Sequence, residues 1–215
     1  MIFKKLKKVF VKETIKKYRY IIILIVLSFL LYFFKKKSSS KSMNLTEDDI
    51  INKTIPFILK QEGGLSNNLN DSASSNPSPT PQKYHTNKGV TYKVFVDSAS
   101  SLGYQPTIQN FLTMPMTIWK QIYKQKYYSQ STLTSEPLLK VYLSLWFWGG
   151  WNKKIVSTKQ VTDICNLKID VIQRLRKLVD LRIYYFNQLV KFNPSYSVFL
   201  KGWTNRANEF YNLFA

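Results

Sequence analysis

The chain has few of the side chains that build metal centres, disulfides or thiol active sites. Its 215 residues include one cysteine, Cys165, and one histidine, His85. A single cysteine excludes a disulfide framework, and this pair is too small a set for a Cys/His metal cluster or an evident Cys–His nucleophile. Catalysis would therefore have to use carboxylates, hydroxyls and backbone groups, and we expect no metal and no cofactor. Cys165 lies in an apolar pattern and is expected to be buried.

Acidic residues are also scarce, with 12 Asp and Glu against 32 Lys and Arg, for a net charge of +20. A strongly basic balance suits nucleic acid, anionic lipid or an acidic polymer. The sequence shows no zinc-finger spacing, no clear helix-turn-helix signal and no RNA-binding aromatic motif. Nucleic acid is therefore not the expected partner, and the sequence leaves the oligomeric state open.

A basic N-terminal segment precedes an uninterrupted apolar run, Ile21 to Phe34. The run spans roughly 21 Å as a helix, which is short of the roughly 30 Å hydrocarbon core, although flanking lysines and tyrosines can extend it. A cleaved signal peptide and a buried core helix are alternatives, but no small-x-small cleavage site follows and lysines stand on both sides. We favour an uncleaved transmembrane signal anchor at 18–35, after a cytoplasmic tail at 1–17. More basic residues precede the run than follow it, so the remainder is expected outside the inner membrane, facing the periplasm or the wall.

The rest of the chain predicts a short linker at 36–45 and one mainly α domain at 46–215. Thr46, followed by three acids, is typical of a helix start, and this helix would be kinked or restarted at Pro56. Thr91 and Thr117 are expected to cap two further helices, the first closed by Gly103. Other helices are expected at 137–148, 158–167, 169–192 and 195–214. Strand signals are weak, so we expect at most a small β-hairpin around 65–90.

One stretch in this domain suggests chemistry, because the apolar helix after Thr46 ends in Glu62-Gly63-Gly64. Glycines after a helix supply its left-handed end, which places Glu62 in the last turn. A helix C-terminus and apolar neighbours both favour the protonated carboxyl, as a general acid requires. An ordinary exposed glutamate before a glycine cap is the alternative. Asp71 or Thr86 could hold the attacking water, as in an inverting glycosidase.

The ordered motifs resemble glycoside hydrolase family 108. They are Glu-Gly-Gly, an Asp nine residues after the Glu, and Thr-x-x-Gly-Val-Thr from Thr86 to Thr91. Two later segments are also similar, an aromatic-ended helix at 111–128 and a Gly-Trp-x-x-Arg element from Gly202 to Arg206. The resemblance runs over about 46–214. It departs from the family's usual short Gly-rich link, because a Ser- and Pro-rich stretch separates Asp71 from Thr86.

The resemblance implies a lysozyme-like helical fold and hydrolysis of the β-1,4 bond of peptidoglycan by an N-acetylmuramidase of phage or bacterial type. It places Glu62 as the catalytic acid, with Asp71 and Thr86 as the other catalytic groups. The expected partners are peptidoglycan glycan strands and, through 18–35, the lipid bilayer. Residues expected near the sugar are Tyr84, Asn87, Tyr128 and Trp151, whereas Trp146, Phe147 and Trp148 are interpreted as core.

Other classes of function remain open at this stage. A membrane-tethered, non-catalytic peptidoglycan-binding protein could keep the same fold. A chitin-degrading enzyme could carry the same acid, and a holin-like membrane-disrupting protein is a weaker fit to a large folded domain. The stereochemistry of hydrolysis depends on the separation of two carboxylates, which sequence spacing does not give.

Overall fold

The computed structural model describes residues 45–67 and 84–215. The predicted cytoplasmic tail at 1–17, the anchor at 18–35 and the linker up to residue 44 lie outside these residues. None of the helices within them is long and apolar enough to cross a membrane. Residues 45–215 form one compact unit.

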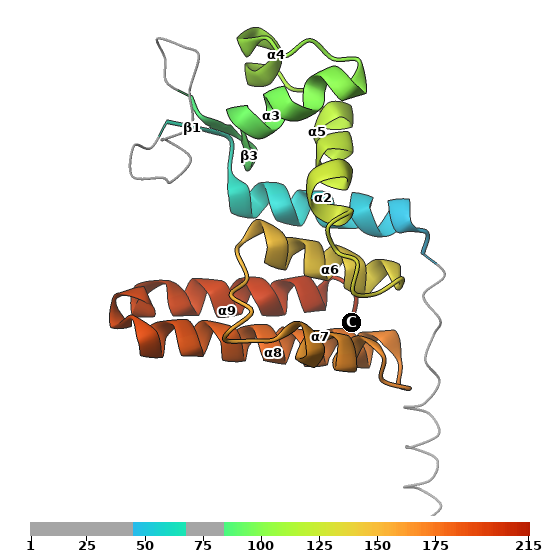
Figure 1. Cartoon of the computed structure of the whole chain (residues 1–215), viewed down its shortest axis with the longest axis vertical. Helices are drawn as coiled ribbons and strands as arrows, with labels where there is room; N and C mark the ends of the chain where they lie inside the picture. Colours follow the sequence, from blue (N-terminus) through green and yellow to red (C-terminus); the bar gives the residue numbers. More distant parts are fainter. Residues whose placement is uncertain (1–44, 68–83) are drawn as a thin grey trace, which may run out of the picture. The chain divides into compact units, whose positions relative to one another are not determined.

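Helix α2 (Glu47–Glu62) lies between two groups of elements (Figure 1). One group holds the small sheet and helices α3 to α5, and the other holds α6, α8 and α9. The sequence predicted how α2 begins: Thr46 Oγ1 accepts a hydrogen bond from the Asp49 N–H, and the Asp49 carboxylate accepts one from the Thr46 N–H. This capping box satisfies two N–H groups at the helix start. The predicted restart at Pro56 does not occur, since α2 continues through it to Glu62.

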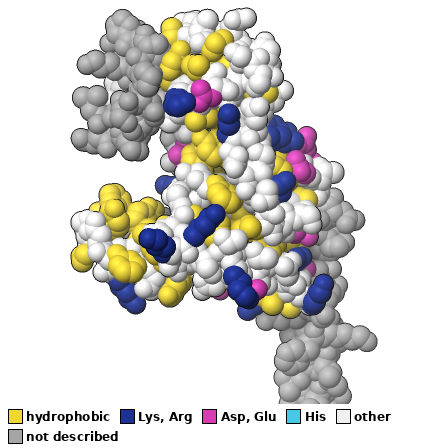
Figure 2. Space-filling view, viewed as in Figure 1, with side chains coloured by type: hydrophobic (Ala, Val, Ile, Leu, Met, Phe, Trp, Pro, Cys, Tyr) yellow, Lys and Arg dark blue, Asp and Glu magenta, His cyan; other side chains and the backbone are white. Residues whose placement is uncertain are grey.

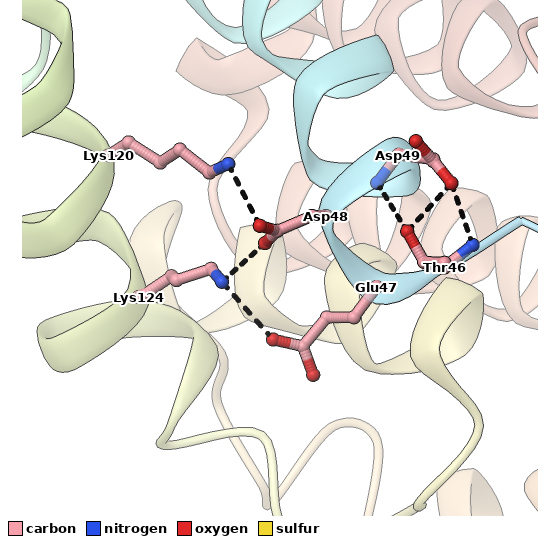
Figure 3. A network of polar contacts seen from close by, with 6 residues as sticks. All are labelled: Thr46, Glu47, Asp48, Asp49, Lys120 and Lys124. Atoms are coloured by element: carbon pink, nitrogen blue, oxygen red, sulfur yellow. Dashed lines mark hydrogen bonds and ion pairs between the residues drawn. The ribbon is translucent and has the colours of Figure 1, made fainter.

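Ion pairs connect the first turn of α2 to two lysines, Lys120 and Lys124, that come later in the chain (Figure 3). Lys124 Nζ lies 2.5 Å from Asp48 Oδ1 and 3.5 Å from Glu47 Oε1, and Lys120 Nζ lies 3.5 Å from Asp48 Oδ2. Lys120 belongs to α5 (Met116–Tyr123), and Lys124 opens the π-helix η3 (Lys124–Tyr128). Asp48 and Glu47 are therefore stabilised by the positive N-terminal end of the α2 dipole. Their ion pairs also hold α5 and η3 against α2.

Asp48→Asn is expected to lower the melting temperature at neutral pH and to have no effect in strong acid. The hydrogen bond from Lys124 is the main cause that lowers the pKa of Asp48 below its ordinary 3.8. The stabilisation is therefore present above the unfolded pKa and is lost as the pH falls through the folded pKa. Thermal unfolding at about pH 7 and about pH 2 measures it. Asp163→Asn is the control, because its partner Lys159 lies on the same helix and joins no two elements. If Asp48→Asn lowers the melting temperature equally at both pH values, the prediction is contradicted.

The sheet has three two-residue strands, β1 (Leu65–Ser66), β2 (Thr86–Asn87) and β3 (Val90–Thr91), in the order β1-β2-β3. Both pairs are antiparallel. The prediction of at most a hairpin is therefore wrong by one strand. β1 joins because the chain leaving α2 pairs its backbone with β2, through the N–H groups of His85 and Lys88 donating to the carbonyls of Ser66 and Gly64.

The remaining described elements are helical, which confirms a mainly α chain and is consistent with a lysozyme-like fold. In chain order they are α3 (Tyr92–Ala99), η2 (Ser100–Leu102), α4 (Ile108–Leu112), α5, η3, α6 (Pro137–Trp148), α7 (Thr158–Cys165), α8 (Val171–Phe192), η4 (Pro194–Tyr196) and α9 (Ser197–Asn212).

Local signals place several of these helices correctly. Thr91 caps α3, its hydroxyl accepting from the Val94 N–H, and Gly103 adopts a left-handed φ of 67° after η2. Cys165 is buried, as expected. The predicted cap at Thr117 is wrong, because α5 begins one residue earlier, after Pro115. Proline supplies no side-chain cap, but its fixed φ suits the residue that leads into a helix.

Helix α6 forms the centre of the core, as its apolar sequence predicted. It contacts α2 and η3 and also α8, which packs along α9 as an antiparallel pair. Leu138, Leu139, Val141 and Leu143 are fully or almost fully buried. The order of these layers sets the end of α2 between the sheet on one side and α6, α8 and α9 on the other.

Candidate active site

Glu62 is the last residue of α2, and the chain turns away directly after it. Gly63 has a φ of 70° and its N–H donates to the Leu59 carbonyl, which ends the helix as the sequence predicted. Glu62 is partly buried and lines a pocket of about 150 Å³ whose other walls come from α6, α8 and α9. The space-filling view shows the surface hollowed between the part that carries the sheet and the free end of the α8–α9 pair (Figure 2). The carboxylate is thus presented at a concave surface on a rigid helix.

The turn between β2 and β3 is fixed beside this carboxylate. Lys88 and Gly89 both have positive φ, 51° and 78°, which is the geometry of a two-residue type I′ hairpin turn. The Lys88 N–H donates to the Gly64 carbonyl at 3.0 Å, and the Lys88 carbonyl accepts from Trp119 Nε1 at 2.9 Å. The turn is therefore tied both to the Gly-Gly corner after Glu62 and to the buried core.

Gly89 packs directly on the Glu62 side chain. A Cβ atom at Gly89 would lie 2.5 Å from Trp148 Cζ2, 2.9 Å from Glu62 Cγ and 3.0 Å from Glu62 Cβ. Such contacts are too short for any side chain, and the positive φ also disfavours one. The glycine of the Thr-x-x-Gly-Val-Thr motif is thus required because backbone, carboxylate stem and indole meet at this point.

Two stacked aromatic rings stand next to Glu62. Tyr127 and Trp148 lie 4.2 Å apart between ring centroids with planes 15° from parallel. Burial, together with the negative charge of Glu62, raises the pKa of Tyr127 to about 12, so its phenol stays protonated at neutral pH. Tyr127 belongs to the π-helix η3, a departure from α geometry that often occurs at functional sites.

Trp148 is the functional candidate that sequence reasoning missed. It was expected in the core with Trp146 and Phe147, yet it is only partly buried and lines the pocket with Glu62. Trp146 is fully buried, in agreement with the expectation. The position of Trp148 in the sequence could have indicated its exposure. It is the last residue of the helix before Gly149-Gly150, and the last residue of a buried helix often reaches the surface.

The structure brings Thr86 into the same sheet as the Lys88–Gly89 turn. Thr86 is buried in β2 and pairs with Ser66 and Thr91. Its Oγ1 lies 3.0 Å from Nδ1 of the buried His85, within hydrogen-bonding distance. The sequence gave no signal for this contact between His85 and Thr86. Tyr84, just before it, is partly buried.

Tyr128 and Trp151, two of the other predicted site residues, make hydrogen bonds elsewhere in the fold. Asp71 lies outside the described residues. The Tyr128 hydroxyl donates to Glu47 at 2.8 Å, at the opposite end of α2 from Glu62. Trp151 is held in the loop after α6, where its Nε1 donates to the Val156 carbonyl at 2.7 Å. Tyr128 and Trp151 thus have partners within the protein, and their contacts with sugar stay predictions.

Asn87 has a structural role where the sequence suggested sugar binding. It is 2 % exposed, and its Nδ2 donates to the carbonyls of Phe111 at 2.6 Å and Leu112 at 3.3 Å. These bonds satisfy the end of α4, whose last carbonyls have no partner within the helix. The amide is therefore committed to joining the sheet to α4.

Asn87→Ala is expected to destabilise the fold by about 1–3 kcal/mol, because buried carbonyls lose their donor. Urea unfolding measures the change. The KM for the substrate of the folded variant is expected to stay the same. Asn187→Ala, at an exposed amide that donates within its own helix, is the control. A raised KM with unchanged stability would restore Asn87 as a sugar ligand.

The described residues hold no group of three or more His, Cys, Asp and Glu side chains that could bind a metal ion.

Comparison with known protein families assigns one segment of the chain. The family model described as glycosyl hydrolase 108 matches residues 55–146. These residues belong to glycosyl hydrolase family 108. The resemblance seen in the motifs is confirmed, and the protein is a glycoside hydrolase of the lysozyme or muramidase type. No curated protein matches the chain, and no solved structure matches it.

The glycosyl hydrolase 108 segment is narrower than the stretch over which the motifs resemble the family. It contains Glu62, the Lys88–Gly89 turn and Tyr127, but it ends at Trp146. Trp148 and the helices α7 to α9 lie beyond it. The pocket that Glu62 lines is therefore built partly from the matched segment and partly from α8 and α9, with Trp148 and Gly149 between them in sequence.

Proposed function

We propose that this glycosyl hydrolase is an N-acetylmuramidase that cleaves the β-1,4 bond of the peptidoglycan glycan strand, with Glu62 as general acid. The observation that carries the proposal is the position of Glu62: it ends a rigid helix, is packed against Gly89 and lines a pocket with Trp148. A glycosidase needs a positioned acid to protonate the leaving oxygen and an apolar surface on which a sugar face can rest.

The catalytic step follows from these positions. Glu62 donates its proton to the glycosidic oxygen as the C–O bond breaks. Water adds its oxygen to the anomeric carbon and releases one proton, which returns through solvent to the Glu62 carboxylate, so the glycan is cut with gain of one water. Asp71 and Thr86 are proposed to orient that water. The Tyr127–Trp148 stack limits the solvent around the acid and packs beside the sugar.

Product analysis tests this function. Purified peptidoglycan is digested with the full chain, the new reducing ends are reduced with borohydride, and the products are identified by mass spectrometry. A muramidase yields reduced N-acetylmuramic acid at the new ends. Reduced N-acetylglucosamine would show the other glycosidic specificity. Sedimentation with peptidoglycan without new reducing ends would show a binding protein and contradict the proposal.

We further propose that residues 18–35 anchor the chain in the inner membrane, with the N-terminus cytoplasmic and the catalytic domain in the periplasm. The distribution of lysines around the apolar run supports this orientation. An exported basic domain would meet its anionic polymer there. Alkaline extraction of membranes tests it: the full chain should stay with the membrane, and a chain lacking 18–35 should be released.

A further inference from the structure

The pocket beside Glu62 contains a buried cation that has no acidic partner in the described chain. Arg182 of α8 is 6 % exposed and lines the pocket. Its Nη1 donates to the Gly150 carbonyl at 3.1 Å, and its guanidinium lies over the rings of Tyr185 and Phe186 at 4.8 Å each. Burial lowers the pKa of Arg182 to about 10, so it remains charged at neutral pH.

Other arginines of the same helix are paired differently. Arg174 lies 3.6 Å from Glu136, and Arg176 lies 2.5 Å from Asp180. Within residues 45–67 and 84–215 no carboxylate forms an ion pair with Arg182. A buried charge is costly unless a counter-charge or several hydrogen bonds compensate for it. Of these three arginines, Arg182 alone has no carboxylate partner in the described residues. Within them, its charge is compensated only by the Gly150 carbonyl and by three ring faces, which include that of Trp146 at 5.0 Å.

Two further buried donors line the same pocket. Tyr142 and Trp146 of α6 are 3 % and 1 % exposed, and neither Tyr142 Oη nor Trp146 Nε1 makes a hydrogen bond of good geometry in the described part of the chain. The two groups contact each other weakly, and this contact with Trp146 opposes the rise in the Tyr142 pKa. Burial raises the pKa of Tyr142, which keeps its phenol protonated. Buried donors normally have acceptors. A cation and two donors without a well-formed hydrogen bond, in an apolar pocket, are complementary to a carboxylate on a small apolar group.

The size of the pocket limits that group. A cavity of about 150 Å³ accepts a molecule the size of benzene, about six non-hydrogen atoms. This inference rests on the proposed function: if the substrate is peptidoglycan, the bound group has to be a substituent of the glycan strand. The lactyl ether of N-acetylmuramic acid has this size and, when no stem peptide is attached, ends in a free carboxylate. Carboxylates of an attached stem peptide are the other source of the same chemistry, but the peptide is much larger.

We propose that this pocket binds the free lactyl carboxylate of peptide-free N-acetylmuramic acid, with Arg182 as its counter-ion and Tyr142 and Trp146 as hydrogen-bond donors. The enzyme then prefers glycan strands whose peptides have been removed. A reaction that hydrolyses the amide bond between the lactyl group and the peptide must supply this substrate. Glu62 lines the same pocket, so the bound substituent positions the neighbouring glycosidic bond at the acid.

Binding measurements test the proposal without relying on catalysis. The full chain carrying Glu62→Gln is titrated calorimetrically with three ligands at about 0.15 M salt, where weak surface attraction is screened. The ligands are the N-acetylglucosamine–N-acetylmuramic acid disaccharide, the same disaccharide with its lactyl carboxyl capped as the methyl amide, and chitobiose. The free acid is expected to bind about tenfold tighter than the other two, as a charge-assisted hydrogen bond implies. Equal affinity for the acid and its amide would overturn the proposal.

Variants assign the effect to the pocket. Arg182→Met is expected to remove the preference for the free acid, and Tyr142→Phe to reduce it several-fold. Tyr142→Phe removes a hydroxyl that makes no hydrogen bond of good geometry in the described chain, so it is expected to keep the fold intact if Arg182→Met does not. Arg176→Met, on the same helix but outside the pocket, should keep the preference. Loss of preference in Arg176→Met as large as in Arg182→Met would show non-specific charge attraction and overturn the assignment.

A second arm separates the two sources of carboxylate and isolates this proposal from the proposed function. Initial rates of the wild-type chain are compared on peptide-free and peptide-bearing strands. Faster cleavage of peptide-free strands supports the lactyl site, and faster cleavage of peptide-bearing strands overturns it. If neither polymer is cleaved but the free acid is still bound preferentially, the proposed cleavage function is wrong and the proposed carboxylate-binding pocket is supported.

Discussion

Glu62→Gln is expected to lower the rate of peptidoglycan cleavage by about 10²- to 10⁴-fold, the usual contribution of a positioned general acid. Glutamine has the same shape and keeps the packing against Gly89 and Trp148, but it has no carboxyl proton to donate to the leaving oxygen. The rate is measured as release of reducing ends from purified peptidoglycan. Binding of the substrate is expected to persist, so the loss should fall on kcat.

A matched control separates the chemistry from a general loss of charge. Glu136→Gln makes the same substitution at a carboxylate paired with Arg174 outside the pocket. This variant should retain nearly full activity. If Glu62→Gln cleaves as fast as Glu136→Gln, another group donates the proton and the assignment of Glu62 is wrong. Circular dichroism of both variants shows that each is folded before rates are compared.

Gly89→Ala is expected to lower both stability and activity. The added methyl would meet Trp148 and the Glu62 stem at 2.5–3.0 Å, on a backbone whose φ of 78° already disfavours a side chain. Backbone strain and overpacking together should cost about 2–5 kcal/mol. The rate should fall further than the unfolded fraction explains, because the methyl displaces the carboxylate itself. Urea unfolding and initial rates measure the two effects.

Gly103→Ala distinguishes crowding from backbone strain. Gly103 also has a positive φ, 67°, but a Cβ there would meet nothing within 4 Å. Its substitution should cost only the backbone term, about 1–2 kcal/mol, and leave the rate of the folded enzyme unchanged. Equal losses in the two alanine variants would mean that the contact with Glu62 has no influence on the site.

Local sequence signals predicted much of the fold because local chemistry decides those features. The capping box at Thr46, the glycine end at Gly63 and the cap at Thr91 each depend on residues within one helical turn, and all three are present. The apolar composition of 137–148 likewise predicted the buried α6. The cap at Thr117 failed because Pro115 offered a competing start, and strand β1 was missed because two residues carry too little pattern.

The candidate site was harder to predict, because residues of the same type serve in the site or in the packing of the fold. Only their surroundings in the folded protein distinguish the two. Asn87 resembles a sugar ligand until its amide is seen to donate to the end of α4. Tyr128 and Trp148 are both aromatic residues at the end of a helix. Tyr128 donates a hydrogen bond to Glu47, whereas Trp148 lies beside Gly89 and Glu62. The anchor at 18–35 and the role of Asp71 stay predictions.

The sequence by itself determined the helical class, the end of α2 at Glu62 and the family motifs, because capping, glycine conformation and apolar periodicity act over a few residues. Only the tertiary structure decided what surrounds the carboxylate. Gly89 and Trp148 reach Glu62 through the sheet and α6, and Arg182 reaches the same pocket from a helix more than a hundred residues later in the chain. Burial and partner choice are properties of packed elements, so the meaning of Glu62-Gly63-Gly64 as a site became definite only when α6, α8 and α9 were in place around it.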